Sequence, residues 1–312
     1  MLHSARGYIG IKMEKLIFTQ WNRPKHYSKI IMEEDTMTIL QKFEELITEV
    51  SGNTKLKVQQ NNIDEVKDSA DFFSQRLLAR AKERMKVEIP EKDYQYDTIG
   101  SLILDWVATT NEPDEEYVWG GFRILSLIES LGVPSHFWDN YNNDSRFWKN
   151  NPQPEAEAIW EKFLPKLNYF HKSGHGDDGT FGCILREEGV YPCPIYFYDS
   201  GIWFKMDMTL EEYYNTMISC KAVYYWQYFY IDTEEIVKKL GNYKPRYVEY
   251  EAYYYNGPHP FLDKFEDGTF TTSAEAVSHQ MKNIIKRFPQ LFSDVDLTLF
   301  KEKCKALERA LK

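Results

Sequence analysis

Apolar residues recur at three- and four-residue steps along the first 170 residues, a pattern that predicts amphipathic helices. The clearest stripe predicts a first helix that ends at Ser51-Gly52-Asn53. Its members are Met37, Leu40, Phe43, Ile47 and Val50. Similar stripes predict four further helices, at residues 64–85, 98–106, 122–131 and 154–170.

The pattern changes after residue 170, where short apolar runs alternate with turn residues. Residues 181–185 predict a strand. Residues 195–198 and 202–206 predict two more strands, and the Asp-Ser-Gly sequence between them is typical of a tight hairpin. Residues 223–230 are strongly aromatic and fit either a strand or a helix, whereas residues 243–255 are expected to contain a strand.

Capping sequences indicate where two later helices begin. Thr209 precedes Glu212 by three residues and forms a capping box, and Asp232 with Glu235 repeats that spacing. The chain then ends in two predicted helices, at residues 273–288 and 294–311, with Pro289 between them. Helices and strands are therefore segregated along the chain, which predicts an α+β fold.

Composition narrows the class of protein. The longest apolar stretch, residues 222–231, is interrupted by Gln227 and is far shorter than the roughly 20 residues of a membrane helix. No signal peptide is visible at residues 1–17, and the four cysteines form no Cys-x-x-Cys pair, so reduced thiols are expected. These features predict a cytoplasmic protein with no membrane partner.

The charge balance is acidic, with a net charge of −10. Residues 282–312 hold eight Lys or Arg and four Asp or Glu, a balance of 8 − 4 = +4, which leaves −14 for the remainder. A nucleic-acid-binding protein would carry a basic face, so no nucleic-acid partner is expected. An acidic body suits a basic protein partner, although it also suits solubility alone.

Motifs that would carry chemistry are not found. Residues 174–179 match G-x-G-x-x-G, but they follow a predicted helix and precede a strand, the reverse of a dinucleotide site. His171 and His175 lie near Asp177 and Asp178, yet the glycines between them disfavour the helix that would bring both imidazoles together. We therefore predict no catalytic residue, no metal and no cofactor.

Aromatic residues make up 16% of the chain and gather at residues 224–230. Rings in so dense a run cannot all face one way, so some are expected at the surface. Tyr and Trp are frequent anchors of protein interfaces and also line sugar sites. Core packing, a protein interface and a ligand groove all stay open for this run.

The middle of the chain resembles the SUKH superfamily, which includes bacterial toxin-immunity proteins and fungal cell-wall regulators. Five segments within residues 87–217 carry the resemblance: Ile89-Pro90-Glu91, Gly120-Gly121-Phe122-Arg123-Ile124, Gly176-Asp177-Asp178, Pro194-Ile195-Tyr196-Phe197-Tyr198-Asp199 and Met208-Thr209-Leu210-Glu211-Glu212-Tyr213. The resemblance implies a mainly antiparallel sheet flanked by helices, without catalytic residues. It also implies tight binding of a toxin, often a nuclease.

The sequence thus predicts a SUKH-like α+β domain at residues 87–240. An irregular start with a helical N-terminal region precedes it at 1–86, and a Tyr-rich segment with a C-terminal helical extension follows at 241–312. The predicted function is that of a non-catalytic immunity protein that neutralises a cognate toxin. An interaction scaffold of the fungal type and a carbohydrate-active enzyme are the alternatives. The predicted partner-binding residues are Asp177, Asp178, Tyr196, Tyr198, Asp199 and Trp203.

Overall fold

A computed structural model describes residues 37–69, 75–109, 118–132, 166–173, 180–199, 202–241 and 272–312. Residues 38–312 belong to one compact unit. The helices in its described part are α1 (Ile39–Gly52), α2 (Ile63–Ser69), α3 (Gln75–Met85), α4 (Leu127–Gly132), α8 (Leu210–Ser219), α9 (Thr233–Leu240), α12 (Ser273–Leu291) and α13 (Thr298–Ala310). Two 3-10 helices, η2 (Glu91–Tyr96) and η4 (Trp226–Tyr230), accompany them.

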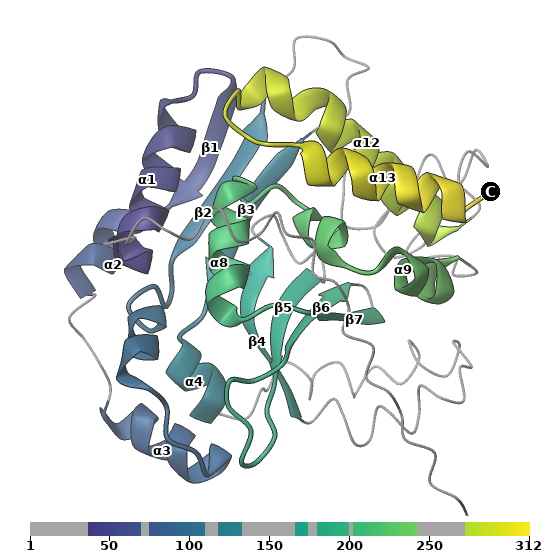
Figure 1. Ribbon diagram of the computed structural model, residues 1–312. Coiled ribbons are helices and arrows are strands. Elements are labelled where there is room, and N and C mark those ends of the chain that lie inside the picture. Colours follow the sequence, from purple (N-terminus) through teal and green to yellow (C-terminus); the bar gives the residue numbers. More distant parts are fainter. Residues whose placement is uncertain are drawn as a thin grey trace, which may run out of the picture. The chain divides into compact units, whose positions relative to one another are not determined.

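The centre of the molecule is an antiparallel sheet whose strands follow one another in chain order (Figure 1). The strands are β1 (Leu56–Asn61), β2 (Ile103–Ala108), β3 (Trp119–Ile124), β4 (Leu167–Ser173), β5 (Thr180–Leu185), β6 (Ile195–Asp199) and β7 (Ile202–Met206). Helices of both the N- and C-terminal regions flank the sheet, so the α+β prediction is confirmed. Because β1 pairs with β2, the sheet extends across the predicted domain boundary at residue 87.

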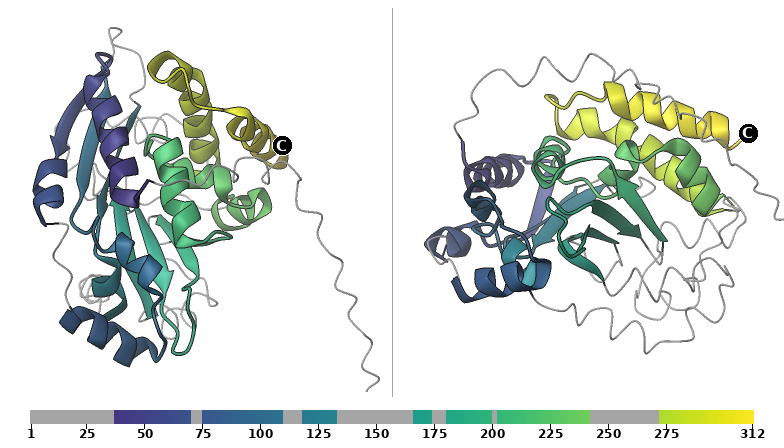
Figure 2. Two further views of the ribbon diagram at one scale, coloured as in Figure 1. Left: turned by 60° about the vertical axis from the view of Figure 1, so that its left-hand side comes forward. Right: turned by 60° about the horizontal axis from the view of Figure 1, so that its bottom comes forward.

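One face of the sheet, called here the first face, packs against helices. Strand side chains alternate between faces, so Trp106, Phe122 and Phe197 point to this side. The ring of Phe122 lies 5.0 Å from Phe43 of α1, and Trp106 lies 5.6 Å from Phe292 after α12. Helices α1, α8, α12 and α13 therefore enclose one continuous apolar core with the first face (Figure 2).

The opposite side, called here the second face, carries a separate apolar cluster on β4 to β7. Five of its side chains are buried: Leu167, Phe181, Cys183, Leu185 and Tyr198. Three more aromatic side chains are half-buried against them: Tyr169, Tyr196 and Trp203. Strands β4 to β7 are thus apolar on both faces, which distinguishes them from strands with one solvated side.

Strand β3 has two neighbours on its far side. Its C-terminal half pairs with β4, whereas its N-terminal half bonds to the segment after α8. Gly121 donates its N–H to the carbonyl of Ala222 at 2.9 Å, and Tyr224 donates to Trp119 at 2.9 Å. The segment that begins at Lys221 is therefore held directly against the sheet.

Local sequence signals predicted several elements correctly. Helix α1, strand β5, the β6–β7 hairpin, and helices α8, α9, α12 and α13 are all present near the expected residues. Thr209 caps α8 through the predicted box with Glu212, and the Asp232 side chain caps α9. The C-cap of α1 is Asn53, within the expected stop sequence.

Other predictions were wrong. Residues 103–108 form strand β2 rather than a helix, and residues 122–131 divide between β3 and α4. Leu104, Asp105 and Trp106 are all buried, and such continuous burial removes the alternation by which a strand is recognised. Pro289 lies inside α12 rather than after it. For residues 223–230, where a strand and a helix were both left open, the structure has the 3-10 helix η4 over Trp226–Tyr230.

Two more differences concern strands. Residues 167–170 open β4 instead of ending a helix, while residues 154–165 lie outside the described part. Strand β1 was not predicted, because its sequence Leu-Lys-Val-Gln-Gln-Asn is mostly polar and exposed at the sheet edge. The strand expected within residues 243–255 also lies outside the described residues.

Candidate functional site

Three of the predicted partner-binding residues meet on the second face. Tyr196 and Tyr198 share this face of β6, as their spacing of two requires, and Tyr198 pairs across the hairpin with Trp203 of β7. Tyr198 is almost fully buried, whereas Tyr196 and Trp203 are partly exposed. We call Tyr196 and Trp203 the aromatic pair, because they are the partly exposed rings among the predicted residues that the structure describes.

Acidic side chains accompany the aromatic pair. Burial raises the pKa of Tyr196, and the negative charges of Glu187 and Glu235 raise it further. Glu235 itself pairs with Lys239 of the same helix at 2.6 Å. Glu187 likewise pairs with Lys166 at 3.3 Å, so the surroundings of the aromatic pair hold charges of both signs.

The outer edge of β7 is covered by a lysine. Lys239 Nζ donates to the carbonyl oxygen of Trp203 at 2.5 Å and lies 5.0 Å from the centre of the Phe204 ring. A charged side chain at an edge strand blocks the addition of a further strand. The backbone edge of β7 is thus blocked at Trp203.

Asp199 is directed elsewhere. Its carboxylate accepts a hydrogen bond from the Tyr228 hydroxyl at 2.6 Å, and Tyr228 packs its ring at 5.2 Å from Phe197 on the first face. Asp199 thus ties the hairpin to η4 and is separated from the aromatic pair. Asp177 and Asp178, in the connection between β4 and β5, lie outside the described residues.

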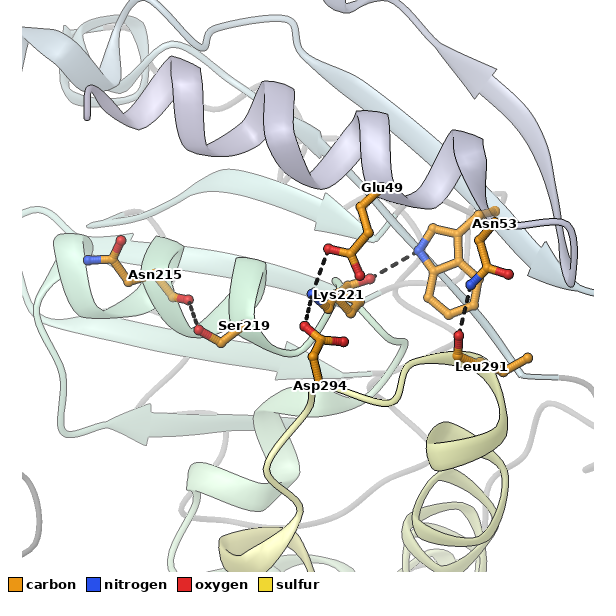
Figure 3. Close-up of polar contacts among 8 residues, drawn as sticks. Glu49, Asn53, Asn215, Ser219, Lys221, Leu291 and Asp294 are labelled. Atoms are coloured by element: carbon orange, nitrogen blue, oxygen red, sulfur yellow. Dashed lines mark hydrogen bonds and ion pairs between the residues drawn. The ribbon is translucent and has the colours of Figure 1, made fainter. Parts of the chain in front are cut away.

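A second polar cluster surrounds Lys221 at the end of α8 (Figure 3). Its ammonium group donates to Glu49 of α1 at 2.7 Å and to Asp294 at 2.9 Å. The Lys221 side chain is 9% exposed, whereas those of Glu49 and Asp294 are 41% and 61% exposed. One cation thus joins three segments that lie far apart in the sequence.

The backbone around Lys221 contributes to the same junction. Its carbonyl oxygen accepts a hydrogen bond from the indole of Trp106 at 3.0 Å. Nearby, the Asn53 side chain donates to the carbonyl of Leu291 at 2.8 Å (Figure 3). Lys221 and Ala222 have φ angles of 51° and 50°, a left-handed conformation that is costly without glycine and persists only where contacts enforce it.

Lys221 is held in its charged form. Burial alone would lower its pKa, but hydrogen bonds to Glu49 and Asp294 outweigh that effect, and the pKa is raised. A permanently protonated amine is a poor nucleophile or base, so this cluster acts as a structural junction. Lys221 was not predicted from the sequence, although a lone lysine beside the apolar stretch 222–231 is a signal for a paired buried charge.

Replacement of Lys221 by methionine tests this junction. We expect Lys221→Met to lower the free energy of unfolding by about 1–3 kcal/mol. This loss is smaller than that for breaking a fully buried ion pair, because both carboxylates reach solvent. Asp294→Asn should cost less than about 1 kcal/mol, since Glu49 still neutralises the lysine. Urea unfolding of each variant measures both effects, and equal losses would contradict a junction centred on Lys221.

Titratable groups in the core are held neutral. Burial lowers the pKa of His171 to about 3, and its Nδ1 lies 2.8 Å from the Tyr213 hydroxyl. Burial also raises the pKa of the Cys193 and Cys220 thiols to about 12, and that of Cys183 further. Thiols with such pKa values are weak nucleophiles at neutral pH.

Among the described residues, no three His, Cys, Asp or Glu side chains are grouped as a metal ion would require. In the same residues, no helix combines the length and apolar character needed to span a membrane. Comparisons with protein-family models, with curated proteins and with solved structures each find no match for this chain.

Proposed function

We propose that this protein is a cytoplasmic immunity-type protein that binds a basic toxin, of the nuclease kind, and blocks it without catalysis. The observation that carries the proposal is the aromatic pair, Tyr196 and Trp203, which is partly exposed, with the charges of Glu187 and Glu235 acting on Tyr196. Aromatic anchors next to acidic groups are the chemistry that a basic protein surface recognises. The net charge of −10 and the resemblance of residues 87–217 to the SUKH superfamily also support it.

Affinity capture of the tagged chain from its native cells, followed by mass spectrometry, tests this function. The expected result is one stoichiometric basic partner that is toxic when expressed alone and harmless when co-expressed with this chain. Several partners in similar amounts would favour an interaction scaffold instead. A captured protein with no toxicity would argue against the immunity role.

The contribution of the aromatic pair is tested by Trp203→Ala in the same complex. Loss of a large anchor is expected to weaken binding by about 2 kcal/mol or more, roughly thirtyfold, mainly through faster dissociation. Trp119→Ala, at the other end of the second face, serves as the matched control and should change affinity little. Equal effects of the two substitutions, with both variants folded, would remove the aromatic pair from the interface.

A further inference from the structure

Helix α3 carries three arginines on its exposed face, spaced by four residues: Arg76, Arg80 and Arg84. We call these three residues the arginine row. The opposite side of α3 is buried and packs on α4, so the row is held toward solvent (Figure 1). Residues four apart lie about 6 Å apart along a helix axis, so the three side chains form one stripe. Residues 75–86 hold five Lys or Arg and one Glu, a balance of 5 − 1 = +4 in a chain of net charge −10.

The described residues offer the arginine row no ion pair. Two lysines of the same segment do have acidic partners, because Lys82 pairs with Glu88 and Lys86 pairs with Glu188. Within the described part of the chain, no carboxylate forms an ion pair with the arginine row, and Glu83 of the same helix is no exception. Arginine binds carboxylates in a planar, two-pronged geometry, and this capacity of the row is not used inside the described structure.

Helix α13 repeats the spacing but not the absence of partners. Its exposed basic residues at four-residue steps are Lys301, Lys305 and Arg309. Lys301 lies close enough to Asp296, and Lys305 to Glu308, for their charges to interact. The spacing alone therefore does not distinguish α3, whereas the lack of an interacting carboxylate among the described residues does.

The arginine row works against the stability of its own helix. Like charges four residues apart repel each other on a helix surface. At the end of the row, Arg84 also lies close to Arg186, which follows β5 and is buried. Burial, with the charge of Arg84 as a second cause, lowers the pKa of Arg186 to about 10. A negatively charged partner at the arginine row would reduce both repulsions.

The surface beside the arginine row disfavours a nucleic acid as that partner. The other exposed side chains of α3 are Gln75, Ala79 and Glu83, none of which is aromatic. Sites for single-stranded nucleic acid combine positive charge with aromatic rings on which the bases stack. Glu83 and the net charge of −10 would also repel a long polyanion.

An acidic peptide fits the spacing of the row. In an extended chain, every second side chain points to the same side, and these side chains lie about 7 Å apart. That step is close to the step of about 6 Å between the arginines, and flexible arginine side chains can span the difference. Carboxylates at alternate positions of an extended segment would therefore each meet one guanidinium group.

We propose that the arginine row of α3 is a docking surface for an extended, acidic segment of a partner protein. This surface is independent of the proposed toxin-binding role, because it lies on α3 instead of the β6–β7 hairpin and attracts the opposite charge. Loss of one role would leave the other in place.

Fluorescence anisotropy of a short labelled peptide of alternating Glu and Ser, titrated with the full-length chain at low ionic strength, tests the surface. Saturable binding that weakens as salt is added is expected, because exposed charges are screened. A peptide of alternating Gln and Ser is the neutral reference. Equal responses to the two peptides, or no binding of the Glu peptide, would overturn the proposal. Tighter binding of a short oligothymidine would overturn it in favour of a nucleic acid.

Substitutions connect the response to the row. The test variant combines Arg76→Gln, Arg80→Gln and Arg84→Gln. It should weaken binding of the Glu peptide roughly tenfold or more, because three charge pairs are lost. The matched control makes the same change in charge at the same spacing on α13, with Lys301→Gln, Lys305→Gln and Arg309→Gln. The control should leave binding nearly unchanged, and an equal loss in both variants would show a non-specific charge effect and overturn the site.

Stability without peptide tests the premise that the row lacks a partner within the chain. Arg80→Gln removes a charge that Arg76 and Arg84 both repel, and arginine and glutamine have similar helix propensities. The midpoint of thermal unfolding should therefore stay the same or rise slightly. A clearly lower midpoint would mean that Arg80 already has a stabilising partner, and the proposal would fail.

Discussion

Gly120→Ala is expected to lower the free energy of unfolding by about 3 kcal/mol or more. A Cβ at Gly120 would lie 2.4 Å from Cζ2 of Trp106 and 2.5 Å from the carbonyl oxygen of Ala222. Neither neighbour can withdraw easily. Trp106 is buried and hydrogen-bonded to Lys221, and the Ala222 carbonyl bonds to Gly121.

Urea unfolding of the purified variant measures this loss, and Gly52→Ala provides the matched control. Gly52 ends α1, and a Cβ there would meet no atom within 4 Å. Its replacement by alanine should leave stability within about 0.5 kcal/mol or raise it slightly. An unchanged midpoint for Gly120→Ala would mean that the segment after Lys221 does not pack against β3 as described.

A double variant separates the two clashes. Trp106→Phe removes the ring atoms closest to the new methyl group. It should therefore lower the free energy of unfolding less in the Gly120→Ala background than in the natural chain. The Ala222 carbonyl stays in place, and recovery should therefore be partial. Additive losses would show that the indole moves away and that the carbonyl alone accounts for the effect.

Local signals made part of this fold predictable. The Thr209 box and the Asp-Ser-Gly turn act over three or four residues, and both the cap of α8 and the β6–β7 hairpin followed from them. Strand β2 could not be recognised in the same way, because residues on both of its faces are buried and Asp105 interrupts its apolar residues, so no alternation remains. Prediction thus succeeded where a local hydrogen bond determines the structure.

The candidate sites also combine features that the sequence predicted with features that it could not predict. A spacing of two placed Tyr196 and Tyr198 on one face, but it could not show that Asp199 would bond to Tyr228. The Lys221 junction joins residues separated by 172 and 73 positions, and no sequence pattern encodes contacts of that range. The pairing of β3 with β4 was equally hidden, because residues 167–170 were taken for the end of a helix.

Acid should destabilise this protein through one buried histidine. His171 lies between the sheet and α8, its Nδ1 lies within hydrogen-bond distance of the Tyr213 hydroxyl, and its Nε2 is buried without a described partner. Burial is the cause that lowers its pKa to about 3, whereas an unfolded chain takes up the proton at about 6.5. The stability that neutral His171 provides is therefore complete above pH 6.5 and is lost progressively as the pH falls toward 3.

The expected size of the effect follows from proton linkage. Through this residue alone, the free energy of unfolding should be about 2 kcal/mol lower at pH 5 than at pH 7.5. Each pH unit below 6.5 contributes roughly 1.4 kcal/mol to this difference. Urea unfolding at the two pH values measures the total change. Carboxylates contribute as well, so the informative quantity is the difference between the natural chain and a variant that cannot titrate at this position.

His171→Asn is the appropriate variant, because its side-chain amide can still reach the Tyr213 hydroxyl but takes up no proton. It should be less stable than the natural chain at pH 7.5, and the gap should narrow by about 2 kcal/mol at pH 5. Tyr213→Phe removes the hydroxyl partner and keeps the histidine, so it should lower stability at both pH values and retain the full acid sensitivity. Parallel pH profiles for His171→Asn and the natural chain would show that His171 reaches solvent before the protein unfolds.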